Sequence, residues 1–99
     1  MSKITLSARG EDCQVRLEGV CNFNPETVVW AHANSLASGK AKGKKSEDAL
    51  GTYACSACHD VIDGRVPRPT FMTWETVQIA FHEGHQRSFL KLLQKGLVK

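Results

Sequence analysis

The sequence lacks any hydrophobic run long enough to cross a membrane. A spanning helix needs about 20 consecutive apolar residues, and every apolar run in this chain is far shorter. The opening residues, MSKITLSAR, also lack the apolar core of a secretory signal peptide. We therefore expect a cytoplasmic protein. That compartment is reducing, so disulfides are disfavoured as the role of its cysteines.

Aromatic residues and prolines are also scarce, and no segment repeats. Aromatic residues make up 7% of the 99 residues, and there are three prolines. Hydrophobic residues reach 41%, which is enough for a globular fold and argues against global disorder. A chain of this length builds only a limited core, so we expect a single domain over residues 1–99 that gains stability from a bound metal.

Charge of either sign is modest. The formal net charge is +3 and the pI is about 8.8, which permits an anionic partner such as nucleic acid without requiring one. Four lysines lie in one glycine-flanked run, which indicates either a solvated loop or a loop that contacts phosphates. Arg65 adds positive charge further along the chain. The candidate nucleic-acid-binding residues are Lys40, Lys42, Lys44, Lys45 and Arg65.

Four cysteines occur in two pairs, and none is left over. The pair Cys55 and Cys58 forms a C-x-x-C clip, and Cys13 and Cys21 are separated by seven residues. Two pairs of thiolates suit a tetrahedral zinc site, which is the interpretation we favour. Disulfides, buried thiols and a redox pair remain alternatives. So does a c-type haem on the Cys55–His59 segment, with Met72 as distal ligand.

Hydrophobic patterns predict an α+β arrangement. Alternating or β-branched segments predict strands over 13–17, 27–33 and 49–54. A short helix is expected from Ser56 to about Asp63, ending at Gly64. A long helix is expected from Trp74 to about Lys95, and residues 3–10 are expected to be a short lead-in. The long helix should cover the core and offers a face for a homodimer.

Several histidines lie where they could act in chemistry. His32 ends a predicted strand, and His59 directly follows the C-x-x-C clip with Asp63 four residues later on the same helical face. This strand–loop–strand–helix order suits phosphodiester hydrolysis, with His32 as general base and His59 and Asp63 holding Mg²⁺ or another divalent cation. Asp48 is a weaker further ligand. Alternatively, His32 is a structural histidine.

Two histidines on the long helix form an H-x-x-H pattern. His82 and His85 lie three positions apart, and no carboxylate or cysteine accompanies them at a diagnostic spacing. We expect both to lie on the surface of the protein.

These residues resemble the zinc-containing HNH, or His-Me finger, endonucleases. In that family a C-x-x-C closes the zinc site and is followed by a metal-binding His or Asn, as Cys58-His59 would be, and the general base ends the first strand, as His32 does. The resemblance implies a small zinc-stapled ββα-metal finger over 8–65 with a long helix over 73–96. Many such fingers carry Asp or His before the base, where this chain has Ala31.

A narrower resemblance is to the YbcO-type nucleases of lambdoid prophages. It is carried by several short segments, including Ala8-Arg9-Gly10, Asp12-Cys13-Gln14-Val15-Arg16, Gly19-Val20-Cys21-Asn22, Asn24-Pro25-Glu26-Thr27, Ala31-His32 and Ala54-Cys55-Ser56-Ala57-Cys58-His59-Asp60. It implies a prophage-encoded, metal-dependent endonuclease in a bacterial host cell, with DNA as substrate. A zinc-stapled DNA-binding or adaptor module without catalysis is the alternative, because a fold does not dictate a function.

Overall fold

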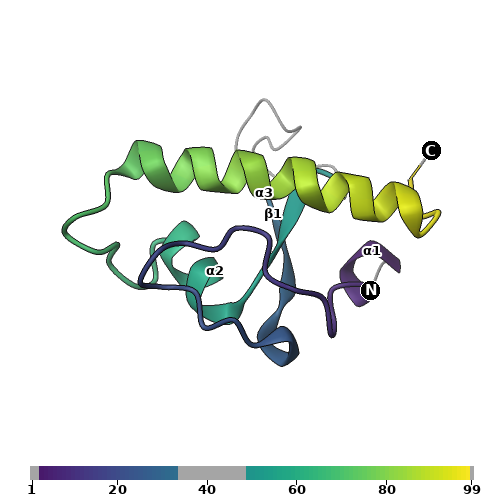
Figure 1. The fold of residues 1–99 in the computed structure, drawn as a ribbon, viewed down its shortest axis with the longest axis horizontal. Coiled ribbons are helices and arrows are strands. Elements are labelled where there is room, and N and C mark those ends of the chain that lie inside the picture. The colour runs from purple at the N-terminus through teal and green to yellow at the C-terminus, as the bar shows by residue number, and fades with distance from the viewer. Residues whose placement is uncertain (1–2, 34–48, 99) are drawn as a thin grey trace, which may run out of the picture.

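In the computed structural model, a long helix lies across a two-stranded hairpin and two shorter helices. The structure describes residues 3–33 and 49–98. Figure 1 shows the last helix running the length of the molecule, with α2 beneath its N-terminal half and α1 beside its C-terminal half. The elements in chain order are α1 (Lys3–Leu6), the 3-10 turn η1 (Pro25–Thr27), β1 (Val29–His32), β2 (Gly51–Ala54), α2 (Ser56–Ile62) and α3 (Trp74–Gln94).

The hairpin forms the centre of the core. Strands β1 and β2 pair antiparallel, with Val29 opposite Ala54 at one end and His32 opposite Gly51 at the other. All four residues of β2 are buried. The outer edge of β2 is also occupied, because the Tyr53 N–H donates to Ser88 Oγ at 3.0 Å and the Tyr53 carbonyl accepts from the Gln14 N–H at 2.8 Å. These bonds leave no open edge at Tyr53 for another chain to pair with.

Both hairpin strands are shorter than the patterns predict. The expected strand over 27–33 begins only at Val29, because Pro25–Thr27 forms the 3-10 turn η1. Asn24 caps this turn by accepting the Glu26 N–H at 3.0 Å on its Oδ1 atom. The turn chemistry of asparagine and proline therefore overrides the β preference of Thr27. The strand expected over 49–54 begins at Gly51.

The short helix α2 matches its prediction closely. It runs from Ser56 to Ile62, and Gly64 has a φ of 77° just beyond its end, as a C-terminal glycine requires. Cys55 is the N-cap, and its sulfur accepts the Cys58 N–H at 3.4 Å. The C-x-x-C clip therefore serves as the start of the helix.

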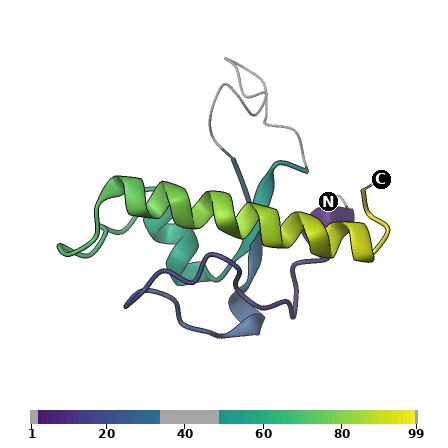
Figure 2. The same cartoon turned by 45° about the horizontal axis from the view of Figure 1, so that its top comes forward.

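The long helix α3 also matches. Thr73 caps its start by accepting the Thr76 N–H at 3.2 Å, and the Leu97 N–H returns to the Leu92 carbonyl at 2.9 Å at its end. A glycine allows the close approach of α3 to β2, since a Cβ at Gly84 would lie 2.7 Å from Thr52 Oγ1. Among the helices formed by residues 3–33 and 49–98, none has the length and apolar character of a membrane span. The turned view in Figure 2 also shows α3 crossing the hairpin.

The strand predicted over 13–17 is wrong. This segment is irregular, and Arg16 adopts a left-handed φ of 54°. The Arg16 N–H points to Cys13 Sγ at 3.4 Å, and the Arg16 side chain bonds the Cys13 carbonyl at 3.1 Å. The chain therefore turns around the Cys13 sulfur, which breaks the strand that the alternating residues indicate.

The N-terminal lead-in contains a helical turn that was not expected. Lys3–Leu6 forms α1, and Ile4 packs into the core with 8% of its surface exposed. Ser7 follows this helix and lies 2.7 Å from the Tyr53 hydroxyl. Glu11 pairs with Lys91 and Lys95 at 3.7 and 3.2 Å, which ties the N-terminal segment to the end of α3. Tertiary contacts therefore order a segment that has little helical pattern of its own.

Candidate functional site

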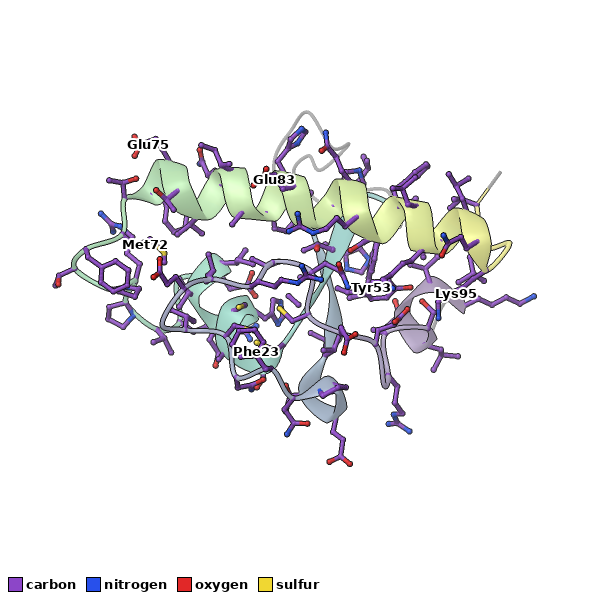
Figure 3. The ribbon with its side chains drawn as sticks, in the orientation of Figure 1. Phe23, Tyr53, Met72, Glu75, Glu83 and Lys95 are labelled. Carbon is purple, nitrogen blue, oxygen red and sulfur yellow. The ribbon has the colours of Figure 1, made fainter. Side chains whose placement is uncertain are left out.

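The four cysteines form one cluster. Their sulfur atoms all lie within 4.8 Å of one another, and all four thiols are free. Cys21 Sγ and Cys55 Sγ are 3.8 Å apart, and thiolates on a tetrahedral zinc are also about 3.8 Å apart, given a Zn–S bond of about 2.3 Å. Figure 3 shows yellow sulfur atoms gathered beside α2. The cluster could bind a metal ion such as zinc, and this confirms the predicted convergence of the two pairs.

Backbone amides point at these sulfurs. The Arg16 N–H reaches Cys13 Sγ and the Cys58 N–H reaches Cys55 Sγ, each at 3.4 Å. Burial raises the pKa of Cys21, and the Phe23 N–H acts on this pKa in the opposite direction. Arg16 and Phe23 have backbone φ values of 54° and 53°, which residues other than glycine rarely adopt. The strained turns are explained by the amides that they direct at sulfur. Such amides stabilise thiolates, the form that binds metal.

Hydrogen bonding and burial shift the pKa values of three of the four cysteines in different directions. A hydrogen bond from Cys58 lowers the pKa of Cys13 to about 4, and that same bond, followed by burial, raises the pKa of Cys58. Burial is the main reason that the pKa of Cys21 rises to about 11. The hydrogen bond from Cys58 therefore favours the thiolate form of Cys13. A cation bound among the sulfurs would favour the thiolate form further.

His59 and Asp63 meet on the surface of α2, as their spacing predicts. His59 Nε2 lies 3.0 Å from Asp63 Oδ2, and both side chains are largely covered, with 24% and 19% of their surfaces exposed. Arg65 joins this pair, because its two terminal nitrogens lie 3.3 Å from Asp63 Oδ2 and 3.5 Å from Asp60 Oδ1. Arg65, predicted to contact nucleic acid, thus also neutralises two carboxylates of its own chain.

His32 lies beside a cavity. It is the last residue of β1, it is half-buried, and it lines a cavity of about 330 Å³ between β1, α2 and α3. Ile62, which directly precedes Asp63, lines the same cavity, so His32 lies close to the end of α2. Ala31 is 1% exposed and offers no ligand atom. The other residues lining the cavity are Ala33, Trp74, Val77, Gln78 and Phe81.

Part of the predicted site lies outside the described residues. The four lysines expected to contact phosphates and the weaker metal ligand fall in the segment 34–48, which the structure does not describe. Their roles stay predictions. They are Lys40, Lys42, Lys44, Lys45 and Asp48.

His85 is less exposed than the sequence analysis predicts. His82 is exposed, as expected, but His85 is half-buried, and its Nδ1 atom lies 2.7 Å from the Gly51 carbonyl oxygen. The expectation of a surface residue is therefore wrong for His85. The sequence pattern could have predicted this partial burial, because His85 follows Gly84 and lies four residues after Phe81, on the side of α3 that faces the hairpin.

Comparison with known proteins gives relatives over almost the whole chain. The sequence profile of the family described as "Putative nuclease YbcO" matches residues 2–97. "Putative nuclease YbcO" of Escherichia coli strain K12 and "Putative nuclease ybcO" of Enterobacteria phage 82 are each 41% identical over 99 residues, covering 100% of this chain and 99% of theirs.

A solved structure also matches the fold. It is "Structure of a putative bacteriophage protein from Escherichia coli str. K-12 substr. MG1655", with a TM-score of 0.74 and 40% sequence identity. The match covers 93% of this chain and 98% of the other. These similarities extend through the cysteine cluster, the hairpin and the long helix. The chain therefore belongs to the YbcO family.

Proposed function

We propose that this protein is a metal-dependent endonuclease of the HNH, or His-Me finger, type that hydrolyses phosphodiester bonds in DNA. The relatives are named as nucleases, which supports a nucleic-acid substrate. One observation carries the proposal. The sulfur cluster joins the Cys13–Cys21 segment to the start of α2, and α2 carries the His59–Asp63 pair beside the strand that ends in His32.

A structural zinc ion at the four sulfurs is the first part of the proposal. Four thiolates at tetrahedral spacing use every ligand position, so the site is closed to substrate and its role is stability. The cluster fits a metal better than the alternatives do. Cys55 and Cys58 group with Cys13 and Cys21, which disfavours haem attachment and an isolated redox pair.

His32 is the proposed general base. Its neutral imidazole would accept a proton from a water molecule, whose oxygen then attacks phosphorus as the bond from phosphorus to the 3′ oxygen breaks. The position of His32 suits this role. It ends a strand whose two central residues are buried, and it also lines a cavity, so it is held in place while remaining partly exposed to a nucleic-acid backbone.

His59 and Asp63 are the proposed holders of the catalytic cation. Their nitrogen and oxygen atoms are 3.0 Å apart and partly exposed, and together they offer donors that divalent cations accept. When bound there, a divalent cation would stabilise charge on the phosphate and on the leaving oxygen. Arg65, 3.3 Å from Asp63, would hold a non-bridging phosphate oxygen once a cation replaced its contact with the carboxylate.

Plasmid nicking with added Mg²⁺ tests the function. The unmodified protein should convert supercoiled plasmid to nicked circles, and His32→Ala should reduce the rate by a factor on the order of 100 to 10,000, as loss of a general base does. Zinc content and melting temperature should stay near those of the unmodified protein. His82→Ala is the matched control, because His82 is exposed and is not among the residues that line the cavity beside His32, so its loss should have no effect. If His32→Ala unfolds the protein, the role of His32 is structural.

A non-catalytic zinc-stapled DNA-binding module is the second candidate. Two observations favour it: a buried alanine precedes His32 where many fingers have a metal ligand, and Arg65 already contacts Asp63. This candidate predicts DNA binding, measured by fluorescence anisotropy, without cleavage of duplex, branched or single-stranded DNA at any divalent metal concentration. Cleavage that depends on His32 would eliminate it.

A further inference from the structure

We propose that His85 is a positioning residue that holds His32 in place through the backbone of Gly51. The inference rests on the proposed function of His32 and adds a residue from α3 to the site. The contact that carries it is the short hydrogen bond of 2.7 Å between His85 Nδ1 and the Gly51 carbonyl oxygen. Gly51 is the residue directly opposite His32 in the hairpin.

The direction of this hydrogen bond is determined by its partners. A carbonyl oxygen only accepts, so Nδ1 of His85 must carry the proton and donate it. The remaining ring nitrogen, Nε2, plays no part in the contact. The interaction therefore requires a donor at the Nδ1 position alone, and a side chain with a donor at that position could replace the imidazole.

The register of the hairpin explains why Gly51 needs a side chain from α3. The Ala33 N–H donates to the Leu50 carbonyl at 2.8 Å, so the pair of His32 and Gly51 is one whose own backbone groups point away from each other. The Gly51 carbonyl thus faces the outer edge of β2. Gly51 is buried, and a buried carbonyl without a donor is destabilising. His85 supplies the donor.

Gly51 is also held from its other side. A Cβ atom added to it would lie 2.5 Å from the Ala31 carbonyl oxygen and 2.8 Å from Trp30 Nε1. The backbone of Gly51 therefore packs against Trp30 and Ala31 on one side, while His85 binds its carbonyl. Because the Cα atoms of such a non-hydrogen-bonded pair are about 4.5 Å apart, a shift of Gly51 moves His32.

Helix α3 also lies near His32 at a second residue, Phe81. Phe81, one turn before His85, lines the cavity that His32 also lines. One helix, α3, thus sets both the wall beside the imidazole of His32 and the backbone opposite it. A residue that anchors α3 to Gly51 would therefore act on the geometry of the reaction, where a misplacement of about 1 Å can cost a factor on the order of 100.

Two substitutions separate positioning from other roles. His85→Asn keeps a donor at the Nδ1 position, whereas His85→Gln places its amide at the Nε2 position and removes the donor to Gly51. Glutamine favours helix more than histidine does, and asparagine is similar to histidine. A loss confined to His85→Gln therefore cannot come from a weaker helix. His82→Asn and His82→Gln are the matched controls, because His82 is exposed and its side chain faces Gln86 on the same helix.

The expected result is a difference between the two variants in two measurements. His85→Asn should keep the plasmid-nicking rate within about threefold, and His85→Gln should lower kcat on the order of 10-fold to 100-fold with zinc content and KM little changed. The melting temperature of His85→Gln should fall by several degrees, because the buried Gly51 carbonyl loses its donor. In ¹H–¹³C NMR spectra, His85→Gln should move the ring signals of His32 and His85→Asn should leave them near their original positions. Equal behaviour of the two variants, or a larger loss in His85→Asn, would overturn the inference.

The two measurements also separate this inference from the proposed function. If the unmodified protein cleaves no DNA but only His85→Gln moves the His32 signals, the positioning contact stands and the nuclease function fails. If the unmodified protein cleaves DNA and neither variant moves the His32 signals, the function stands and the positioning role of His85 is wrong.

Discussion

The cysteine cluster and the histidine site are built in different ways. The cluster consists of four equivalent sulfur atoms within 4.8 Å, with backbone amides directed at them. The histidine site is spread over β1, α2 and α3, and its polar groups contact one another, as His59, Asp63 and Arg65 do. The four sulfurs are already placed to bind a metal ion such as zinc, whereas the proposed histidine site would need both a cation and a substrate to organise it. On the proposed function, the cluster would stabilise the fold and the histidine site would carry the chemistry.

Removal of metal from the cysteine cluster should have the largest effect on stability. Structural zinc contributes on the order of 10 kcal/mol to small zinc-bound folds. We expect about one zinc per chain by elemental analysis, and a loss of the cooperative thermal transition in excess chelator. Cys58→Ser should release zinc and loosen the fold in the same way. A protein that remains folded without metal would show that the cluster is dispensable.

A charge change at Asp63 should affect chemistry and spare the fold. Asp63→Asn keeps the side-chain volume but weakens the proposed cation site, so we expect the nicking rate to fall on the order of 100-fold, with partial recovery at high Mg²⁺. Asp60→Asn is the matched control, because Asp60 also contacts Arg65, whereas the carboxylate that pairs with His59 is that of Asp63. Equal loss in both variants would indicate that the charge around Arg65 matters rather than a cation site.

Gly51→Ala should disturb both regions through the hairpin. The new methyl group would lie 2.5 Å from the Ala31 carbonyl, which is backbone and cannot move aside freely. We expect a loss of about 1–3 kcal/mol in the free energy of unfolding, as for other overpacked sites, measured by urea denaturation of the zinc-loaded protein. Unchanged stability would show that the hairpin end adapts, and it would weaken the case for a rigid His32.

Arg65→Ala should have the smallest effect on stability. The Arg65 side chain is 64% exposed, and exposed ion pairs contribute at most about 1 kcal/mol. We expect a change in the free energy of unfolding within about 0.5 kcal/mol, but weaker DNA binding and a salt-dependence slope reduced by about one. A large loss of stability would mean that Arg65 mainly holds the end of α2 in place.

The elements whose ends carry capping residues were the predictable ones. Thr73, Gly96 and Gly64 mark the ends of α3 and α2 where local chemistry alone dictates them. The segment after Cys13 was predicted wrongly, because it bonds β2 only through Gln14 and then turns so that the Arg16 N–H faces the Cys13 sulfur. The α1 turn was missed since its contacts with Tyr53 come from residues far along the chain.

In the histidine site, too, contacts within one element were predictable and contacts between elements were not. The i, i+4 spacing of His59 and Asp63 was enough to predict that the two side chains meet, because a helix brings such positions together. No spacing rule could relate His85 to Gly51, since they lie 34 residues apart and meet only when α3 packs on β2. The cavity beside His32 arises from the same packing.

The sequence by itself determined the local chemistry of this protein: which residues can bind metal, which can transfer a proton, and where its two main helices begin and end. These features depend on residue type and on spacing within one element. The number and pairing of the cysteines already predicted that the four sulfurs share one centre, whereas the tertiary structure alone decided that α3 supplies a histidine to the strand opposite His32. Such contacts depend on how elements pack, and packing is a property of the whole chain.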